Sequence, residues 1–135
     1  MKNLDEFRTK TEAIDYILKE SKPGMTRSEA EKILLQKIPK ESYYQSRIIR
    51  YLKAKYPLAF VWKAAAGPYS YKGIPDVCMI LDGRYFGFEV KRPFIGKASA
   101  MQLQTIDMIR RAGGTAGIVT TVADVEKLIR EGRIV

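Results

Sequence analysis

Asp76, Glu89 and Lys91 are the residues whose types and spacing could do chemistry. The stretch between the two carboxylates is centred on Asp82-Gly83, a strong signal for a type I′ β-hairpin. With these two as the loop residues, Asp76 lies directly opposite Glu89. Because side chains on a strand alternate between its faces, Lys91 shares the face of Glu89. The sequence therefore predicts two facing carboxylates with a lysine beside them.

Two carboxylates directly opposite each other are unfavourable by roughly 0.2–1 kcal/mol. A hard divalent cation would offset this, because it takes oxygen ligands from one or two carboxylates plus substrate phosphates. Lys91 could then orient or help deprotonate an attacking water, or neutralise charge that grows on a phosphate. The alternative is an exposed charge ladder on a sheet face, with Asp76 capping the turn after Pro75. Residues 41–97 hold 10 basic and only 4 acidic residues, which favours the site.

Polar residues on two predicted helices could join this site. Glu41 and Gln45 lie four apart and extend the apolar stripe of a helix over residues 41–55. An acid in the first turn is also favoured by the helix dipole alone. Gln102 aligns with apolar residues of a later helix, although Ser99-x-x-Gln102 is also a capping box. The structural and the functional interpretation stay open for each of them.

The residues that the chain lacks restrict its chemistry. It has no histidine, which excludes His-based acid–base catalysis, Ser-His-Asp triads and His-ligated metals. Its one cysteine, Cys78, excludes an internal disulfide and a cysteine-based zinc site, and fits a reducing compartment. Apolar runs are too short to span a bilayer, and the first residues are no signal peptide. We therefore expect a cytoplasmic protein with no membrane contact and no organic cofactor.

The charge distribution predicts a nucleic-acid partner. The chain carries a net charge of +9, and residues 41–135 hold 15 basic against 8 acidic residues, whereas residues 1–40 are nearly balanced. Seven of the eight tyrosines lie between Tyr43 and Tyr85, interleaved with basic residues, as suits contacts to a phosphate backbone and to bases. The side chains expected to contact DNA are Tyr69, Tyr71, Lys72, Lys63, Arg92 and Lys97.

The predicted elements divide the chain near Pro39 into two parts. Residues 1–40 form a helical extension, with one helix over residues 4–20 and another that begins at Thr26. Such a pair could be a helix-turn-helix reader, a packing appendage or a dimer arm. Residues 41–135 read as an α/β domain in the order α-β-β-β-α-β-α. Its expected elements are helix 41–55, strands 58–63, 76–81 and 84–91, helix 99–112, strand 116–120 and helix 121–130.

Taken in order, these motifs resemble the PD-(D/E)XK nuclease signature and, more fully, the virus-type replication-repair nuclease (VRR-NUC) family. Glu41 and Gln45 match the Glu and Gln on the first helix of the family. Its Gly-x-Pro-Asp, Glu-x-Lys and downstream Gln are matched by Gly73-Ile-Pro75-Asp76, Glu89-Val-Lys91 and Gln102. The resemblance covers roughly residues 41–128. One departure is Ser99-Ala-Met-Gln102, where the family often has Ser-Pro-Glu-Gln.

This resemblance implies a restriction-endonuclease-like core, with a mixed central sheet flanked by helices and preceded here by the two-helix extension. It implies Mg²⁺- or Mn²⁺-dependent hydrolysis of DNA, with Asp76, Glu89 and Glu41 at the metal, Lys91 serving the water, and Gln45 and Gln102 in support. Stand-alone members of similar size tend to be homodimers that act on branched DNA such as four-way (Holliday) junctions. The alternatives are a DNA-binding module without catalysis and a sequence-specific restriction-type endonuclease.

Overall fold

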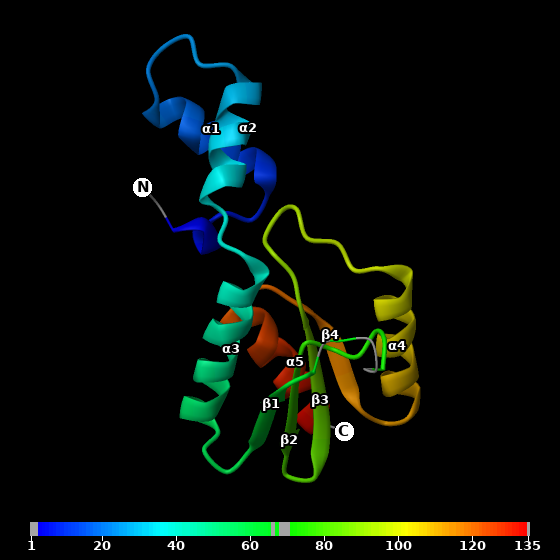
Figure 1. Cartoon of the computed structure of the whole chain (residues 1–135). Coiled ribbons are helices and arrows are strands. Elements are labelled where there is room, and N and C mark those ends of the chain that lie inside the picture. The colour runs from blue at the N-terminus through cyan, green and yellow to red at the C-terminus, as the bar shows by residue number, and fades with distance from the viewer. Residues whose placement is uncertain (1–2, 66, 68–70, 135) are drawn as a thin grey trace.

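A mixed four-stranded sheet forms the centre of the computed structural model, which describes residues 3–65, 67 and 71–134 (Figure 1). The strands lie in the order β1-β2-β3-β4. The pairs β1–β2 and β2–β3 are antiparallel, whereas β3 and β4 are parallel. Their bounds are Phe60–Lys63 (β1), Val77–Leu81 (β2), Arg84–Val90 (β3) and Thr115–Val119 (β4).

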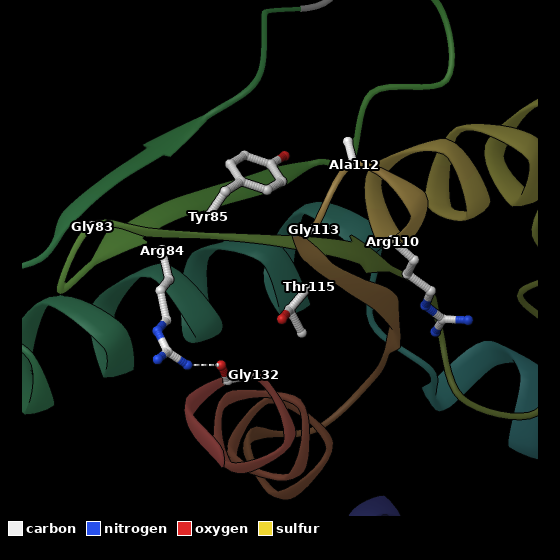
Figure 2. Close-up of a pocket in the computed structure, with 9 residues that line it drawn as sticks. Gly83, Arg84, Tyr85, Arg110, Ala112, Gly113, Thr115 and Gly132 are labelled. Atoms are coloured by element: carbon white, nitrogen blue, oxygen red, sulfur yellow. Dashed lines mark hydrogen bonds between the residues drawn. The ribbon is translucent and has the colours of Figure 1, made fainter. Parts of the chain in front are cut away.

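Helices cover both faces of this sheet. α3 (Glu41–Lys55) and α5 (Val122–Ile134) pack on one face, and α4 (Ala100–Arg111) lies on the other side (Figures 1 and 2). The order α3-β1-β2-β3-α4-β4-α5 confirms the predicted α/β architecture, a restriction-endonuclease-like core with a mixed sheet. The predicted apolar face of the hairpin is also confirmed, because it is buried against α3 and α5 through Val77, Met79, Leu81, Phe86, Phe88 and Val90.

The β2–β3 hairpin has the register that its turn predicted. Val77 pairs with Phe88, as the two-residue loop requires. The loop residues Asp82 and Gly83 have φ angles of 53° and 76°, both positive as in a type I′ turn. Glycine adopts such an angle without steric cost, and aspartate is one of the residues that tolerate it. The local turn sequence thus sets which residues face each other at the open end of the hairpin.

The N-terminal extension begins differently from the single helix predicted over residues 4–20. A 3-10 turn, η1 (Leu4–Glu6), comes first, and α1 (Lys10–Glu20) follows. Between them the backbone at Phe7 is extended and its ring is buried. Thr9 then caps α1, because its side chain accepts a hydrogen bond from a backbone N–H of the first turn. The helical spacing of apolar residues was therefore misleading here, since the cap and the packing of Phe7 break the helix.

The extension has a hydrophobic cluster of its own. α2 (Arg27–Lys37) begins at Thr26 with the predicted capping box and packs against α1. The buried members of this cluster come from the extension, and Phe94 and Ile95 from the loop after β3 pack against it. The boundary at residue 40 stays a prediction, because this loop contributes to the cluster of the extension.

Side-chain contacts join the extension to the α/β domain. Nε and Nη2 of Arg92 donate hydrogen bonds to the backbone carbonyls of Pro39 and Ile38, each at 2.9 Å. Arg47 of α3 donates to Asp5 at 2.7 Å. Figure 1 shows the extension beyond the first turn of α3, at the end of the sheet where β3 ends. The loop that follows β3 is therefore anchored to the extension through Arg92, and α3 is anchored to it through Arg47.

Among the described residues, no helix is long and apolar enough to cross a membrane. The longest, α3, has 15 residues. A span through the hydrocarbon core needs roughly 20.

Candidate active site

Asp76 and Glu89 meet at the open end of the hairpin. Asp76 directly precedes β2, and Glu89 lies near the end of β3. Oδ2 of Asp76 accepts a hydrogen bond of 2.9 Å from the backbone N–H of Val90, the neighbour of Glu89. This bond holds the Asp76 side chain against β3, close enough to Glu89 for its charge to raise the pKa of that carboxyl. The facing arrangement that the hairpin register predicted is therefore present in the structure.

Glu89 is a carboxyl with no exposed surface. Its Oε1 accepts a hydrogen bond of 2.7 Å from Nε2 of Gln102 and lies 3.5 Å from Nζ of Lys91. Its Oε2 is buried and has no hydrogen-bond partner among the described residues. Burial is the main cause that raises the pKa of Glu89 to about 8; the charge of Asp76 raises it too, and Lys91 lowers it. Without a cation, this carboxyl therefore keeps its proton near neutral pH.

Lys91 and Gln102 approach the pair from different elements. Lys91 follows β3 directly, and its backbone N–H donates to the carbonyl of Val119 in β4, which fixes its position. Gln102 lies in the first turn of α4 and makes two hydrogen bonds at once. Its Oε1 accepts from the backbone N–H of Ser99 and closes the capping box, while its Nε2 donates to Glu89. Both interpretations of Gln102 are therefore compatible with the structure.

Glu41 and Gln45 contact each other on α3. Gln45 is buried, and its Nε2 donates to Oε1 of Glu41 at 3.3 Å. Within the described ranges, no group of three or more Asp, Glu, His or Cys side chains is placed to hold a metal ion. The structure thus pairs Asp76 with Glu89 but does not gather Glu41 with them as the expected third carboxylate. The roles of Glu41 and Gln45 in catalysis stay predictions.

A cavity of about 260 Å³ opens beside Asp76. The loop between β1 and β2 lines it with Tyr71 and Lys72, and both side chains are exposed. Two of the side chains predicted to contact DNA are therefore next to the carboxyl pair. A third, Tyr69, lies outside the described residues.

Gly73 is the point at which this loop packs against α4. Its φ is 84°, and a Cβ atom there would lie 2.5 Å from Oγ1 of Thr105 and 3.0 Å from the carbonyl oxygen of Met101. A side chain at this position would therefore be strained both by the backbone angle and by the contact. The Gly-x-Pro-Asp spacing marked Gly73 in the sequence, but its packing partner was missed, because α4 lies far along the chain. Through this contact the segment before Asp76 is held against the helix of Gln102.

The other side chains predicted to contact DNA differ in their surroundings. Lys63 at the end of β1 and Lys97 before α4 are exposed. Arg92 is half-buried and its guanidinium donates to the carbonyls of Pro39 and Ile38. The structure thus gives Arg92 a role in joining the extension to the domain. Sequence reasoning missed this role, because a contact across 53 residues leaves no local signal.

A larger cavity, of about 590 Å³, lies at the opposite end of β3 (Figure 2). Arg84, Tyr85, Arg110 and Thr115 line it, and none of its described lining residues is acidic. Arg84 donates to the backbone carbonyl of Gly132 in α5 and so ties the hairpin to that helix. Without carboxylates, this cavity cannot supply the paired-acid chemistry.

The chain was compared with protein families, with curated proteins and with solved structures, and the comparison with solved structures gives a match. Neither known protein families nor curated proteins give a match. Among solved structures, the chain is similar to one described as "VRR_NUC domain", with a TM-score of 0.51 and 28% sequence identity. The match covers 64% of this chain and 95% of that chain. The resemblance that the motifs indicated is thus confirmed, and the chain contains a nuclease-type domain with the VRR-NUC fold.

Proposed function

We propose that the chain is a metal-dependent endodeoxyribonuclease that hydrolyses phosphodiester bonds in branched DNA. The observation that carries this proposal is Glu89, a fully buried carboxyl beside Asp76 and Lys91, one oxygen of which has no hydrogen-bond partner among the described residues. Burying an acceptor without a partner costs free energy, so such a group is expected to serve a ligand. The similarity to the VRR_NUC domain structure supports a nuclease activity.

Asp76 and Glu89 are suited to Mg²⁺ or Mn²⁺. Their oxygens are the donors that hard cations prefer, and Mg²⁺ is commonly held by one or two carboxylates together with substrate phosphates. Oε2 of Glu89 is the oxygen that has no hydrogen-bond partner in the part of the chain that the structure describes. A cation beside Glu89 would favour its ionised form against the burial that raises its pKa. When bound, the ion supplies Lewis-acid stabilisation of the charge that develops on the phosphate.

The residues around Asp76 and Glu89 hold these carboxyls in position and can stabilise negative charge on the phosphate. Gln102 holds Oε1 of Glu89 in place from α4. Nζ of Lys91 lies 3.5 Å from the same oxygen, and the lysine side chain is 12% exposed. It can therefore donate a hydrogen bond to an attacking water or to the phosphate and stabilise negative charge there. Lys72 lines the cavity beside Asp76, which supports its proposed contact with the DNA backbone.

The finer parts of the proposal are branched DNA and a homodimer. The basic surface of residues 41–135 supports phosphate binding. A domain of about 95 residues has little surface with which to hold several DNA arms, and paired incisions need two sites related by symmetry. Light scattering should therefore give a mass near twice 15.4 kDa. A strict monomer that still cuts junctions symmetrically would contradict this assembly.

The test is cleavage of a labelled four-way junction, compared with flap, nicked, single-stranded and linear duplex DNA of the same sequences. We expect the junction to be cut with Mg²⁺ or Mn²⁺ and to remain intact with EDTA. Asp76→Asn should abolish cleavage while DNA binding remains. Asp107→Asn is the matched control, because Asp107 is an exposed acid on α4 that pairs with Arg111.

The possible outcomes separate the alternatives. Strong cleavage that survives chelation would overturn the metal mechanism. Binding without cleavage of any substrate in any metal would identify a DNA-binding module instead. Cutting of linear duplex at one defined sequence would point to a restriction-type endonuclease.

A further inference from the structure

The sheet face that carries Asp76 and Glu89 also carries a row of large side chains. Phe60 pairs with Ile80, and Ile80 pairs with Tyr85, so the three stand side by side across β1, β2 and β3. Strand side chains alternate, and Ile80 is four residues from Asp76, so the row and the carboxyl pair share one face. α4 packs along β4, at the opposite edge of the sheet from β1.

The part of this face near β1 is exposed and aromatic. Phe60 is 65% exposed and Ile80 is 43% exposed. The ring of Trp62 lies 5.2 Å from that of Phe60 and 6.4 Å from that of Tyr85, measured between centroids. Figure 2 shows Tyr85 on the side of the sheet away from α5. These neighbouring residues are called the aromatic platform below: Phe60, Trp62, Ile80 and Tyr85.

The aromatic platform leads directly to the candidate active site. Trp62 pairs with Cys78, two residues along the chain from Asp76. At about 3.4 Å per residue, this places Trp62 and Asp76 about 7 Å apart along the strand direction. The backbone N–H of Ala64 also donates to the carbonyl of Asp76 at 2.9 Å, so the end of β1 is bonded to the site. A strand of DNA with one phosphate at the carboxyl pair can therefore place a nearby base on the platform.

The charge around the platform matches nucleic acid. Lys63 directly follows Trp62 and is exposed, and Lys72 lines the cavity beside Asp76. At the hairpin turn, the carboxylate of Asp82 is paired with Arg133. Phosphates that approach this face thus meet Lys63 and Lys72, which are both exposed. A standard protein interface uses roughly 20–30 residues from each partner, whereas the platform has four side chains. The platform is therefore too small to be the binding surface for a second copy of the chain.

We propose that the aromatic platform stacks unpaired nucleobases of the substrate, so that this nuclease engages DNA through a single-stranded segment beside the cleaved bond. The proposal rests on the proposed nuclease function and adds that bases unpaired near the branch strengthen binding of the substrate. Aromatic stacking tolerates any sequence, because every base has a π-face. Bases inside an intact duplex are stacked on each other and reach the platform only at the cost of unpairing.

Trp62 makes this surface directly observable, because it is the one tryptophan of the chain. The probe is a single-stranded oligonucleotide added to the full-length protein in EDTA, so that nothing is cleaved. An abasic oligonucleotide of the same length carries the same phosphates without bases, and a linear duplex carries bases that are already stacked. We expect the single strand to quench the fluorescence of Trp62, and the other two to leave it nearly unchanged.

Two substitutions test the contribution of stacking. Phe60→Ala removes a largely exposed ring, so the fold should be retained, which thermal melting verifies. It should weaken binding of the single strand by about 5- to 100-fold, the loss expected for one stacked base. Binding of the abasic strand should not change. Leu58→Ala is the matched control, because Leu58 is 98% exposed, has no ring and lies two residues away, and this variant should bind as wild type does.

The proposal fails if the abasic strand quenches as strongly as the normal one, or if F60A binds the single strand with wild-type affinity. It also fails if the fluorescence changes with protein concentration alone and F60A lowers the mass in light scattering, which would assign the platform to a second copy. Failure of the nuclease function gives a different result. If the protein cuts no substrate in Mg²⁺ but its fluorescence is quenched only by DNA that carries bases, the nuclease function is refuted and base stacking on the aromatic platform is supported.

Discussion

The side chain of Gln102 joins the first turn of α4 to the buried carboxyl of Glu89. One end of its amide accepts from the backbone N–H of Ser99, and the other donates to Glu89 at 2.7 Å. Capping by itself requires just an acceptor, which glutamate supplies equally well. The bond to Glu89 requires a donor as well. Glutamine meets both requirements at position 102, and glutamate does not. The start of α4 and the position of the Glu89 carboxyl therefore both depend on Gln102.

Gln102→Glu separates these two tasks. The substitution keeps the acceptor for the capping box but replaces the donor next to Glu89 by a third carboxyl. We expect cleavage to fall at least tenfold, while helix capping is preserved. Gln102→Ala should lose the cap as well and lower the free energy of unfolding by about 1 kcal/mol. Thermal melting and single-turnover cleavage measure the two effects. A Q102E protein that cuts at the wild-type rate would show that the bond to Glu89 is dispensable.

The raised pKa of Glu89 makes the stability of the metal-free protein depend on pH. The carboxyl titrates at 4.5 in its ordinary state and at about 8 in the folded chain, so between these values the folded state binds more protons than the unfolded state. The free energy of unfolding should therefore decrease as pH rises from about 5 to 8. Urea unfolding in EDTA measures this slope. Glu89→Gln should flatten it, whereas Glu131→Gln, at an exposed acid of α5, should not. Equal slopes for wild type and E89Q would contradict the assignment.

Mg²⁺ should offset the loss of stability that deprotonation of Glu89 causes as the pH rises. Mg²⁺ competes with the proton on Glu89, so its stabilising effect should be larger at pH 8 than at pH 6. The measurement is the increase in melting temperature on adding Mg²⁺ at each pH, without DNA. Asp76→Asn should reduce this increase strongly, and Asp107→Asn should leave it unchanged. A melting temperature that does not respond to Mg²⁺ at either pH would contradict a site formed by the protein alone.

Arg92 and Lys97 should behave differently although both were predicted to contact DNA. Arg92→Ala removes two hydrogen bonds to backbone carbonyls and should lower the free energy of unfolding by about 1–3 kcal/mol. It should leave the salt dependence of DNA affinity unchanged. Lys97→Ala, at an exposed position, should leave stability unchanged and reduce the slope of log affinity against log salt by about 0.9. The reverse pattern would mean that the guanidinium of Arg92 leaves its carbonyls to bind DNA.

Features set by neighbouring residues could be predicted from the sequence. The turn at Asp82-Gly83 fixes the hairpin register locally, and with it the pairing of Val77 with Phe88 and the approach of Asp76 to Glu89. α3 begins and ends at the expected residues for the same reason, since its apolar stripe is regular.

Features set by contacts between distant segments could not be predicted in this way. The helix expected over residues 4–20 breaks because Phe7 packs into a cluster formed with α2. The engagement of Arg92 with Pro39 depends on how the extension folds back on the domain. The resemblance implied Glu41 as a third carboxylate at the metal; Glu41 contacts Gln45 on α3, and its role at the metal stays a prediction.

The separate hydrophobic cluster of the extension has a consequence for how the molecule opens. Seven buried side chains form it, so it opens at a lower free energy than the larger sheet core. Backbone amides of α1 and α2 should then exchange their hydrogens with solvent through local opening, while those of β2 and β3 exchange on global unfolding. Phe94 packs on this cluster with a left-handed backbone, φ 66°, a conformation that is costly for an aromatic residue. Phe94 lies three residues after Lys91, so we expect each local opening to release this strained backbone close to the candidate active site.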